Sequence, residues 1–151
     1  MSALRIARPE DFAKLDALVA AFHAHDAIAS TAERRHDGIM PLLEGSPHGV
    51  IYLIGPSSSP VGYIALAFNW SIEYGGLEAI VDEFFIREKI RGRGMGQDAL
   101  NQIIAMLREN GVKLVTLETA FDSPAMSLYR RVGFVSRANY AYMIRELQPG
   151  L

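Results

Sequence analysis

The chain has 151 residues, of which 50% are hydrophobic and 21% charged. This composition is ordinary for a globular protein, and the length suits one domain with a hydrophobic core, so we expect a single domain over residues 1–151. A net charge of −2 gives no reason to expect nucleic acid or an anionic membrane as a partner. No signal peptide or long apolar run is recognisable. The absence of cysteine excludes disulfides and an acyl-cysteine intermediate and fits a cytoplasmic protein.

Apolar periodicity and turn signals predict the elements of the first half of the chain. In order, these are a strand over 4–7, a helix over 9–23, a short helix within 25–47, and strands over 50–54 and 61–68. Pro9 suits the first turn of the first helix. The apolar face of that helix is formed by Phe12, Leu15, Leu18, Val19 and Phe22.

The second half begins after a turn at Tyr74-Gly75-Gly76. The predicted elements are a strand over 79–86, a long helix that ends before Gly111, a strand over 112–119, a short helix over 124–131, and strands over 134–137 and 140–145. A glycine is favoured just beyond a helix C-terminus, as at Gly111. The resulting order, β-α-α-β-β-β-α-β-α-β-β, predicts an α/β fold. Its mixed, mostly antiparallel sheet has six to seven strands flanked by about four helices.

The most informative motif is Arg91-Gly92-Arg93-Gly94-Met95-Gly96, between a predicted strand and a helix. Glycines let the backbone approach a ligand closely, and the helix N-terminus offers unpaired N–H groups to an anion. We therefore interpret the loop as a pyrophosphate site; an ordinary strand-to-helix turn is the alternative. A dinucleotide fingerprint would need glycine or alanine in place of Gln97, and a Walker loop would need Lys-Ser/Thr.

A second motif, from Asp122 to Phe134, follows N-x-x-A-x-x-x-Y-x-x-x-G-F except that Asp122 replaces asparagine. Together with the R-x-x-G-x-G spacing of the glycine-rich loop, it resembles the signatures of the GNAT superfamily of N-acetyltransferases. The resemblance implies a GNAT fold and transfer of acetyl from acetyl-CoA to a primary amine by direct attack. It implies a small-molecule amine as partner and no metal. We also expect a homodimer.

The resemblance implies cofactor contacts from three segments. The strand residues would act through their backbone groups on the acetyl and pantetheine parts, and the loop would bind the pyrophosphate. A carboxylate at Asp122 cannot donate the amide hydrogen that asparagine gives to pantetheine, so that contact is weakened. The implied residues are Phe84, Phe85, Ile86, Arg91, Gly92, Arg93, Gly94, Met95, Gly96, Gln97, Asp122, Ser123, Pro124, Ala125 and Arg131.

Three residues are candidates for proton transfer. The resemblance implies that Tyr129 protonates the leaving sulfur; a tyrosine that only packs the last helix is the alternative. Asp82 or Glu83 would accept a proton from the amine, unless both are solvated carboxylates at the sheet margin. Strand alternation places Asp82 on the face of Phe84 and Ile86 and Glu83 on the other face, unless a bulge intervenes. We therefore expect Asp82 to matter more.

The stretch Val81-Asp82-Glu83-Phe84-Phe85-Ile86 resembles the diamine and polyamine branch of the superfamily. His25 and Asp26 fall where that branch has an aromatic-Glu pair, so the resemblance implies substrate contacts from His25, Asp26 and Asp82. Another amine acceptor (an amino acid, an aminoglycoside or a protein α-amine) is an alternative, and so is a non-catalytic acyl-CoA-binding domain. The spacing of His23 and His25 is poor for a metal site.

Overall fold

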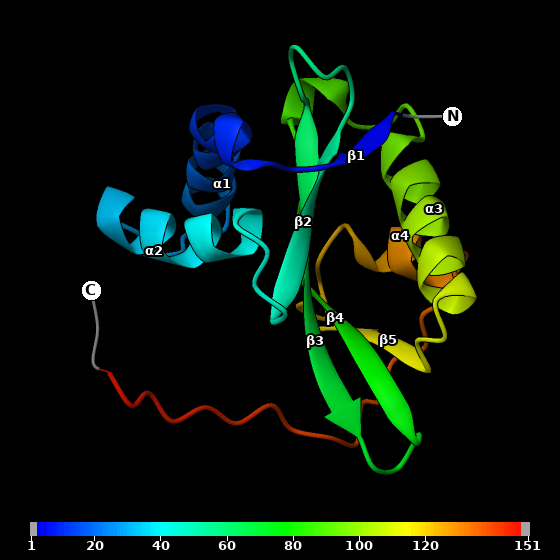
Figure 1. Cartoon of the computed structure of the whole chain (residues 1–151). Helices are drawn as coiled ribbons and strands as arrows, with labels where there is room; N and C mark the ends of the chain where they lie inside the picture. The colour runs from blue at the N-terminus through cyan, green and yellow to red at the C-terminus, as the bar shows by residue number, and fades with distance from the viewer. Residues whose placement is uncertain (1–2, 149–151) are drawn as a thin grey trace.

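A computed structural model describes residues 3–148 (Figure 1). Its strands are β1 (Leu4–Ile6), β2 (Gly49–Ile54), β3 (Gly62–Ser71), β4 (Gly76–Ile86) and β5 (Leu114–Leu117). Its α-helices are α1 (Phe12–His25), α2 (Ala32–Leu43), α3 (Met95–Glu109) and α4 (Met126–Arg131), with 3₁₀ turns η1 (Pro9–Asp11) and η2 (Glu88–Ile90). The α/β fold and the four helices are confirmed.

Strand order in the sheet is β1-β2-β3-β4-β5. The first three pairings are antiparallel and only β4 and β5 are parallel, so the prediction of a mixed, mostly antiparallel sheet is confirmed. The parallel pairing covers Glu78–Val81 of β4 and stops there. Within residues 3–148, the end of β4 over residues 82–86 therefore has no neighbouring strand on its β5 side.

The sheet separates two apolar layers, with α1 and α2 on one face and α3 and α4 on the other (Figure 1). Because helices cover both faces of the sheet, the sequence of β3 is nearly continuously apolar and does not alternate between apolar and polar residues. The α1 layer includes Leu15, Leu18, Ile39, Tyr63, Ala65 and Phe85. The α3 layer includes Ile64, Leu66, Ala79, Val81, Leu100 and Ile103.

Local signals set the helix ends. The Thr31 side chain accepts a hydrogen bond from the backbone N–H of Arg34 (3.1 Å) and begins α2. The apolar stripe of α3 is buried as its periodicity predicts, and the helix ends before Gly111, which has a φ of 78°. The sequence therefore predicted these elements to within a few residues.

β4 carries a bulge at Asp82. Ala65 lies opposite Glu83 and Leu66 lies opposite Val81, so Asp82 has no partner on β3. One extra residue shifts the alternation of side chains beyond it. As a result Val81 packs in the α3 layer, whereas Glu83 and Phe85 lie on the α1 side.

The two C-terminal strands predicted over 134–137 and 140–145 are wrong for this structure. Residues 134–148 form no strand and are mostly exposed. They pass beside the turn between β3 and β4, where Arg137 donates to Tyr74 (2.9 Å), and then continue below the sheet in the view of Figure 1. An alternating pattern becomes a strand only when a neighbour supplies the ladder hydrogen bonds. No such neighbour exists within residues 3–148, and for this reason the sheet has five strands there rather than six or seven.

Candidate active site

A cavity of about 1590 Å³ lies between the end of β4, β5, the start of α3 and α4. Most of the residues that the sequence singled out line it. They are His25, Asp26, Phe84, Phe85, Ile86, Arg91, Gly92, Gly94, Met95, Gly96, Gln97, Ser123, Pro124, Ala125, Tyr129 and Arg131. Four of the predicted residues do not line it, namely Asp82, Glu83, Arg93 and Asp122.

The glycine-rich loop, residues 91–96, leads directly into α3. Gly92 and Gly94 have φ values of 82° and 76°, in the left-handed region that favours glycine. Gly94 is the N-cap, so no side chain caps the first N–H groups of α3. Gly96 lies in close packing, since an added Cβ would lie 3.2 Å from Leu128 and 3.4 Å from Phe84. The loop thus presents backbone donors at the positive end of a helix.

Two arginines are held beside this loop. The Nε of Arg91 donates to the carbonyl of Ile86 (2.7 Å), and its guanidinium lies 5.4 Å from the ring centroid of Phe85. The Nε of Arg131 donates to Oε1 of Gln97 (3.3 Å), which joins α4 to the first turn of α3. Positive charge therefore gathers at the end of the cavity where the helix N-terminus lies.

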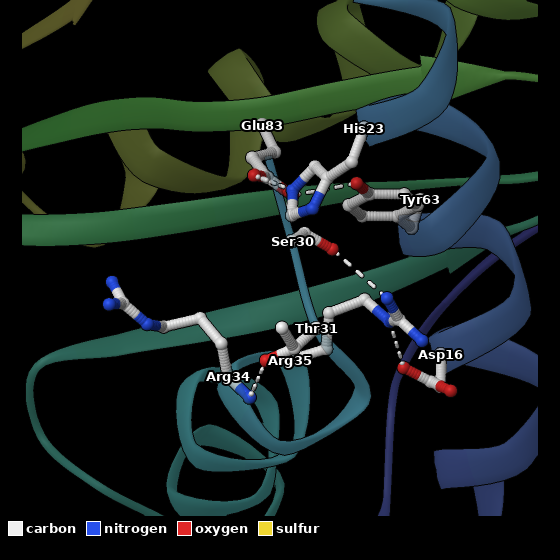
Figure 2. A network of polar contacts seen from close by, with 8 residues as sticks. All are labelled: Asp16, His23, Ser30, Thr31, Arg34, Arg35, Tyr63 and Glu83. Carbon is white, nitrogen blue, oxygen red and sulfur yellow. Dashed lines mark hydrogen bonds and ion pairs between the residues drawn. The ribbon is translucent and has the colours of Figure 1, made fainter. Parts of the chain in front are cut away.

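Glu83 is the centre of a polar cluster on the α1 side of β4 (Figure 2). The Tyr63 hydroxyl donates to its Oε1 (2.7 Å), and the His23 Nε2 is 2.7 Å from its Oε2. Tyr63 is fully buried, and burial followed by the charge of Glu83 raises its phenol pKa. The side chain of Glu83 is 23% exposed, so it is fixed by two partners and still reaches solvent.

Sequence reasoning missed His23 and Tyr63 as partners of Glu83. His23 lies on α1, and its Nδ1 is buried with no hydrogen-bond partner within residues 3–148. The sequence offered one signal, namely that a buried polar side chain needs a hydrogen-bond partner. This signal did not identify Glu83 as the partner of His23 and Tyr63, because the position of Glu83 opposite β3 depends on the bulge.

The expectation that Asp82 shares the face of Phe84 and Ile86 assumed an unbroken alternation, and the bulge at Asp82 interrupts it. Although Asp82 is an exposed residue by surface area, partial burial and then the charge of Glu83 raise the pKa of its carboxyl, while His23 opposes the rise. The charges that act on Asp82 thus belong to the α1 side of the sheet.

Tyr129 lies on α4 and lines the cavity. Its ring packs edge-on against Phe134, with centroids 5.9 Å apart. Burial raises the pKa of its phenol, and the negative charge of Asp26 adds to the rise. The phenol therefore stays protonated at neutral pH, as a proton donor must. The influence of Asp26 also shows that the end of α1 acts on α4 across the cavity.

Carboxylates from several elements line the cavity. Asp26, at the end of α1, pairs with the Nδ1 of His25 (2.9 Å), and Glu73 and Glu78 come from the β3–β4 hairpin. The loop after Asp26 contacts Arg35, which donates to Ser30 (3.0 Å) and to Asp16 of α1 (2.7 Å) (Figure 2). The cavity is therefore lined by residues of both charges.

Comparison with known proteins agrees with this architecture. The profile of the Acetyltransferase (GNAT) family matches residues 15–134. The chain belongs to this family.

An uncharacterized N-acetyltransferase of Methanocaldococcus jannaschii is 31% identical over 80 residues, which is 52% of this chain; the match spans about a third (35%) of that relative. The crystal structure of an integron cassette protein from the mobile metagenome of Cole Harbour Salt Marsh is 31% identical. It aligns with a TM-score of 0.84 over 97% of this chain and 91% of that one. An aminoglycoside acetyltransferase from an uncultured soil metagenomic sample, in complex with trehalose, shares the fold with a TM-score of 0.81 at 14% identity, over 97% of each chain.

Within residues 3–148, no three histidine, aspartate or glutamate residues come together as a metal site. Over the same residues, none of the helices has the length and apolar character needed to span a membrane.

Proposed function

We propose that the protein transfers acetyl from acetyl-CoA to a small cationic primary amine by direct attack. One observation carries the proposal: an uncapped helix N-terminus with a glycine-rich loop and a tyrosine with a raised pKa line the same cavity. The loop binds an anion, and the tyrosine can donate a proton to a leaving group.

The loop fits the pyrophosphate of acetyl-CoA. An added Cβ at Gly92 or Gly94 would meet no chain atom within 4 Å, so the space beside these residues is open to a ligand. The N–H groups that begin α3 and the charges of Arg91 and Arg131 would hold the phosphates. The edge of β4 over 82–86 would hold the pantetheine chain through backbone groups. We assign no contact to Arg93 or Asp122.

When bound, acetyl-CoA supplies an activated acetyl thioester. Tyr129 donates its hydroxyl proton as negative charge develops on the leaving sulfur, and it takes a proton back from solvent afterwards. A group that acts only in the transition state raises kcat without changing the affinity for the substrate.

Glu83 does not itself line the cavity but reaches solvent, and it accepts the proton of the attacking amine through a water molecule. An alkyl amine with a pKa of about 10.4 is mostly protonated at neutral pH, so a nearby carboxylate is needed to remove the proton. The hydrogen bonds from Tyr63 and His23 keep the Glu83 carboxylate in one orientation. Asp82 acts as a second, more exposed carboxylate beside it.

The acceptor is cationic, since the carboxylates of Asp26, Glu73 and Glu78 line the cavity. Two unit charges about 4 Å apart attract by roughly 1 kcal/mol in water and about 4 kcal/mol at an effective dielectric constant of 20. A di- or polyamine would gain from several such contacts, as would an aminoglycoside, whereas the carboxylate of an amino acid would be repelled.

The experiment is a panel of amines assayed for release of thiol from acetyl-CoA. Putrescine, spermidine and an aminoglycoside should be acetylated more efficiently than glycine or glutamate. Asp26→Ala should raise the KM for the preferred amine with little change in kcat. Preference for an anionic amine would contradict the cationic acceptor, and binding of acetyl-CoA without turnover of any amine would favour the non-catalytic alternative.

A further inference from the structure

Glu78 of β4 is a carboxylate that two neutral side chains hold in place. The Asn69 amide on β3 donates to its Oε1 (3.2 Å), and the Thr116 hydroxyl on β5 donates to its Oε2 (2.8 Å). Each carboxylate oxygen thus accepts one hydrogen bond and keeps a lone pair for a further donor. A side chain that is already ordered loses less entropy when a ligand binds to it.

The charge of Glu78 is not neutralised by another side chain. None of the ion pairs within residues 3–148 includes Glu78. Arg137 lines the same cavity, but its guanidinium donates to the Tyr74 hydroxyl (2.9 Å). Glu78 is half-buried, so its carboxylate is partly desolvated and has only neutral partners. Such a carboxylate gains from a cation that enters the cavity.

Glu78 and Glu83 lie on the same face of β4, although they are five positions apart. Ala79 and Val81 pack in the α3 layer, so alternation places Glu78 on the α1 side. Beyond the bulge at Asp82, Glu83 also lies on the α1 side. Without the bulge, the two carboxylates would project from opposite faces of the sheet.

The register with β3 gives the separation of the two carboxylates along the strand. Glu83 lies opposite Ala65, and Glu78 lies opposite Asn69. The four steps from position 65 to position 69, at about 3.4 Å each, amount to roughly 14 Å. The same cavity is lined by Glu78, by all four residues of β5 and by Tyr129. A flexible chain can therefore follow β5 from Glu78 toward the reacting end.

We propose that Glu78 binds a second ammonium group of the acceptor and thereby selects long, linear diamines and polyamines. This assignment rests on the proposed function, in which Glu83 accepts a proton from the reacting amine. A long diamine places one amine near Glu83 and the other at Glu78. A short diamine reaches only one of the two carboxylates, and a monoamine gains nothing from the charge of Glu78.

Two amines with the same carbon chain test the assignment. 1,8-Diaminooctane carries a charge at both ends, whereas octylamine carries one charge, and thiol release from acetyl-CoA measures the turnover of each. The unaltered protein should have the higher kcat/KM for the diamine. Glu78→Gln should lower the ratio of kcat/KM for the diamine to that for octylamine by about tenfold or more, because one charge contact is lost. Glutamine keeps the size of the side chain and can still accept from Thr116.

Further variants separate this role from a structural one. Glu33→Gln is the matched control and should leave the ratio unchanged, because Glu33 is exposed on α2 and does not line the cavity. Thr116→Val, which removes one donor to Glu78, should lower the ratio, and Thr116→Ser should restore it. The preference for 1,8-diaminooctane over 1,3-diaminopropane should decrease in Glu78→Gln.

The outcomes distinguish this assignment from the proposed function. An unchanged ratio in Glu78→Gln, or equal kcat/KM values of the unaltered protein for 1,8-diaminooctane and octylamine, would overturn the role of Glu78 while the acetyl transfer stands. If the unaltered protein acetylated neither these two amines nor any other amine, the proposed function would be contradicted, and the role of Glu78 with it.

Discussion

The environment of the Glu83 carboxylate depends on one extra residue in β4. Without the bulge at Asp82, strict alternation would continue from Ala79 and Val81 and carry position 83 to the α3 side. With the bulge, the Glu83 carboxylate contacts Tyr63 and His23, whereas the neighbouring Asp82 stays exposed. The surroundings of the two acids are therefore set by backbone geometry rather than by residue type.

Glu83→Gln should lower kcat by about 10²-fold or more relative to the unaltered protein, and Asp82→Asn should lower it less. Both changes keep the size of the side chain and remove its charge, and glutamine can still accept from Tyr63, so thermal unfolding should change little. The loss should be greatest at low pH, where less of the amine is deprotonated. Steady-state kinetics from about pH 6 to 9 measure this; a larger loss for Asp82→Asn would show that Asp82 is the base.

Tyr129→Phe should lower kcat by about 10²–10⁴-fold and leave the affinity for acetyl-CoA nearly unchanged. The phenol contributes only when the sulfur gains charge, and the ring that packs on Phe134 is retained. Pre-steady-state measurement of thiol release separates the chemical step from product release. An unchanged chemical step would leave Tyr129 as a packing residue.

Among the elements, α3 has two clearly different parts. Its middle turns bury an apolar stripe, while its first turn stays uncapped beside the cavity. The two functions meet at Gly94, whose positive φ turns the chain into the helix. The helix thus combines a buried apolar stripe with an uncapped N-terminus that we propose as the anion site.

Gly94→Val should abolish acetyl-CoA binding in calorimetry while the protein stays folded. A left-handed residue with a Cβ is destabilised by roughly 1–2 kcal/mol, and a branched side chain would enter the open space beside the loop. Gly111→Val is the matched control, because Gly111 has nearly the same φ (78°) at the other end of α3 and equally open surroundings. Equal affinities for acetyl-CoA in the two variants would contradict the loop assignment.

The ion pair between Arg5 of β1 and Asp11 of η1 should make the free energy of unfolding depend on pH in the acid range. Two hydrogen bonds from Arg5 lower the pKa of Asp11 to about 2, against burial, which raises it. A depressed folded pKa means that this stabilisation is complete above about pH 4 and is lost as the pH falls through about 2. Asp11→Asn should lower the free energy of unfolding by about 1.5–3 kcal/mol at neutral pH. In urea titrations the difference from the unaltered protein should shrink below pH 4; a constant difference would contradict the assignment.

Most elements could be predicted from the sequence because their signals are local. The stripe of α3, the glycine at 111 and the turn at 74–76 need no knowledge of the rest of the chain. The bulge could not be predicted, since its register is set by β3, which lies about twenty positions earlier in the sequence. Residues 134–148 show the same limit: their alternating pattern predicted two strands, which the structure does not form, because a strand also needs a partner.

For the candidate site, most of the residues predicted from the loop and the second motif line the cavity. The motifs encode backbone approach and charge, which depend on residue type and spacing. The hydrogen-bond partners of Glu83 could not be predicted, because His23 and Tyr63 come from separate elements and meet only in the folded chain. Motifs thus predicted which residues line the cavity better than they predicted the partners of Glu83.

For the molecule as a whole, the cavity carries charges of both signs. Arg91 and Arg131 line it near α3 and α4, and Asp26 lines it at the end of α1. We propose that the arginines attract the anionic cofactor and that the carboxylates attract the cationic amine, with Tyr129 on the same wall. Because surface charges are screened by salt, raised ionic strength should weaken the binding of both substrates.

The central claim is that this cavity moves an acetyl group onto a cationic amine. The most direct measurement incubates the protein with acetyl-CoA and spermidine, then quantifies acetylated amine by mass spectrometry and free thiol in the same sample. Equal amounts of the two products are expected, formed only with both substrates present and strongly reduced in Tyr129→Phe. Thiol release without any acetylated amine would contradict acetyl transfer by this cavity. Acetylation of an anionic amine, with no product from spermidine, putrescine or aminoglycosides, would contradict a cationic acceptor.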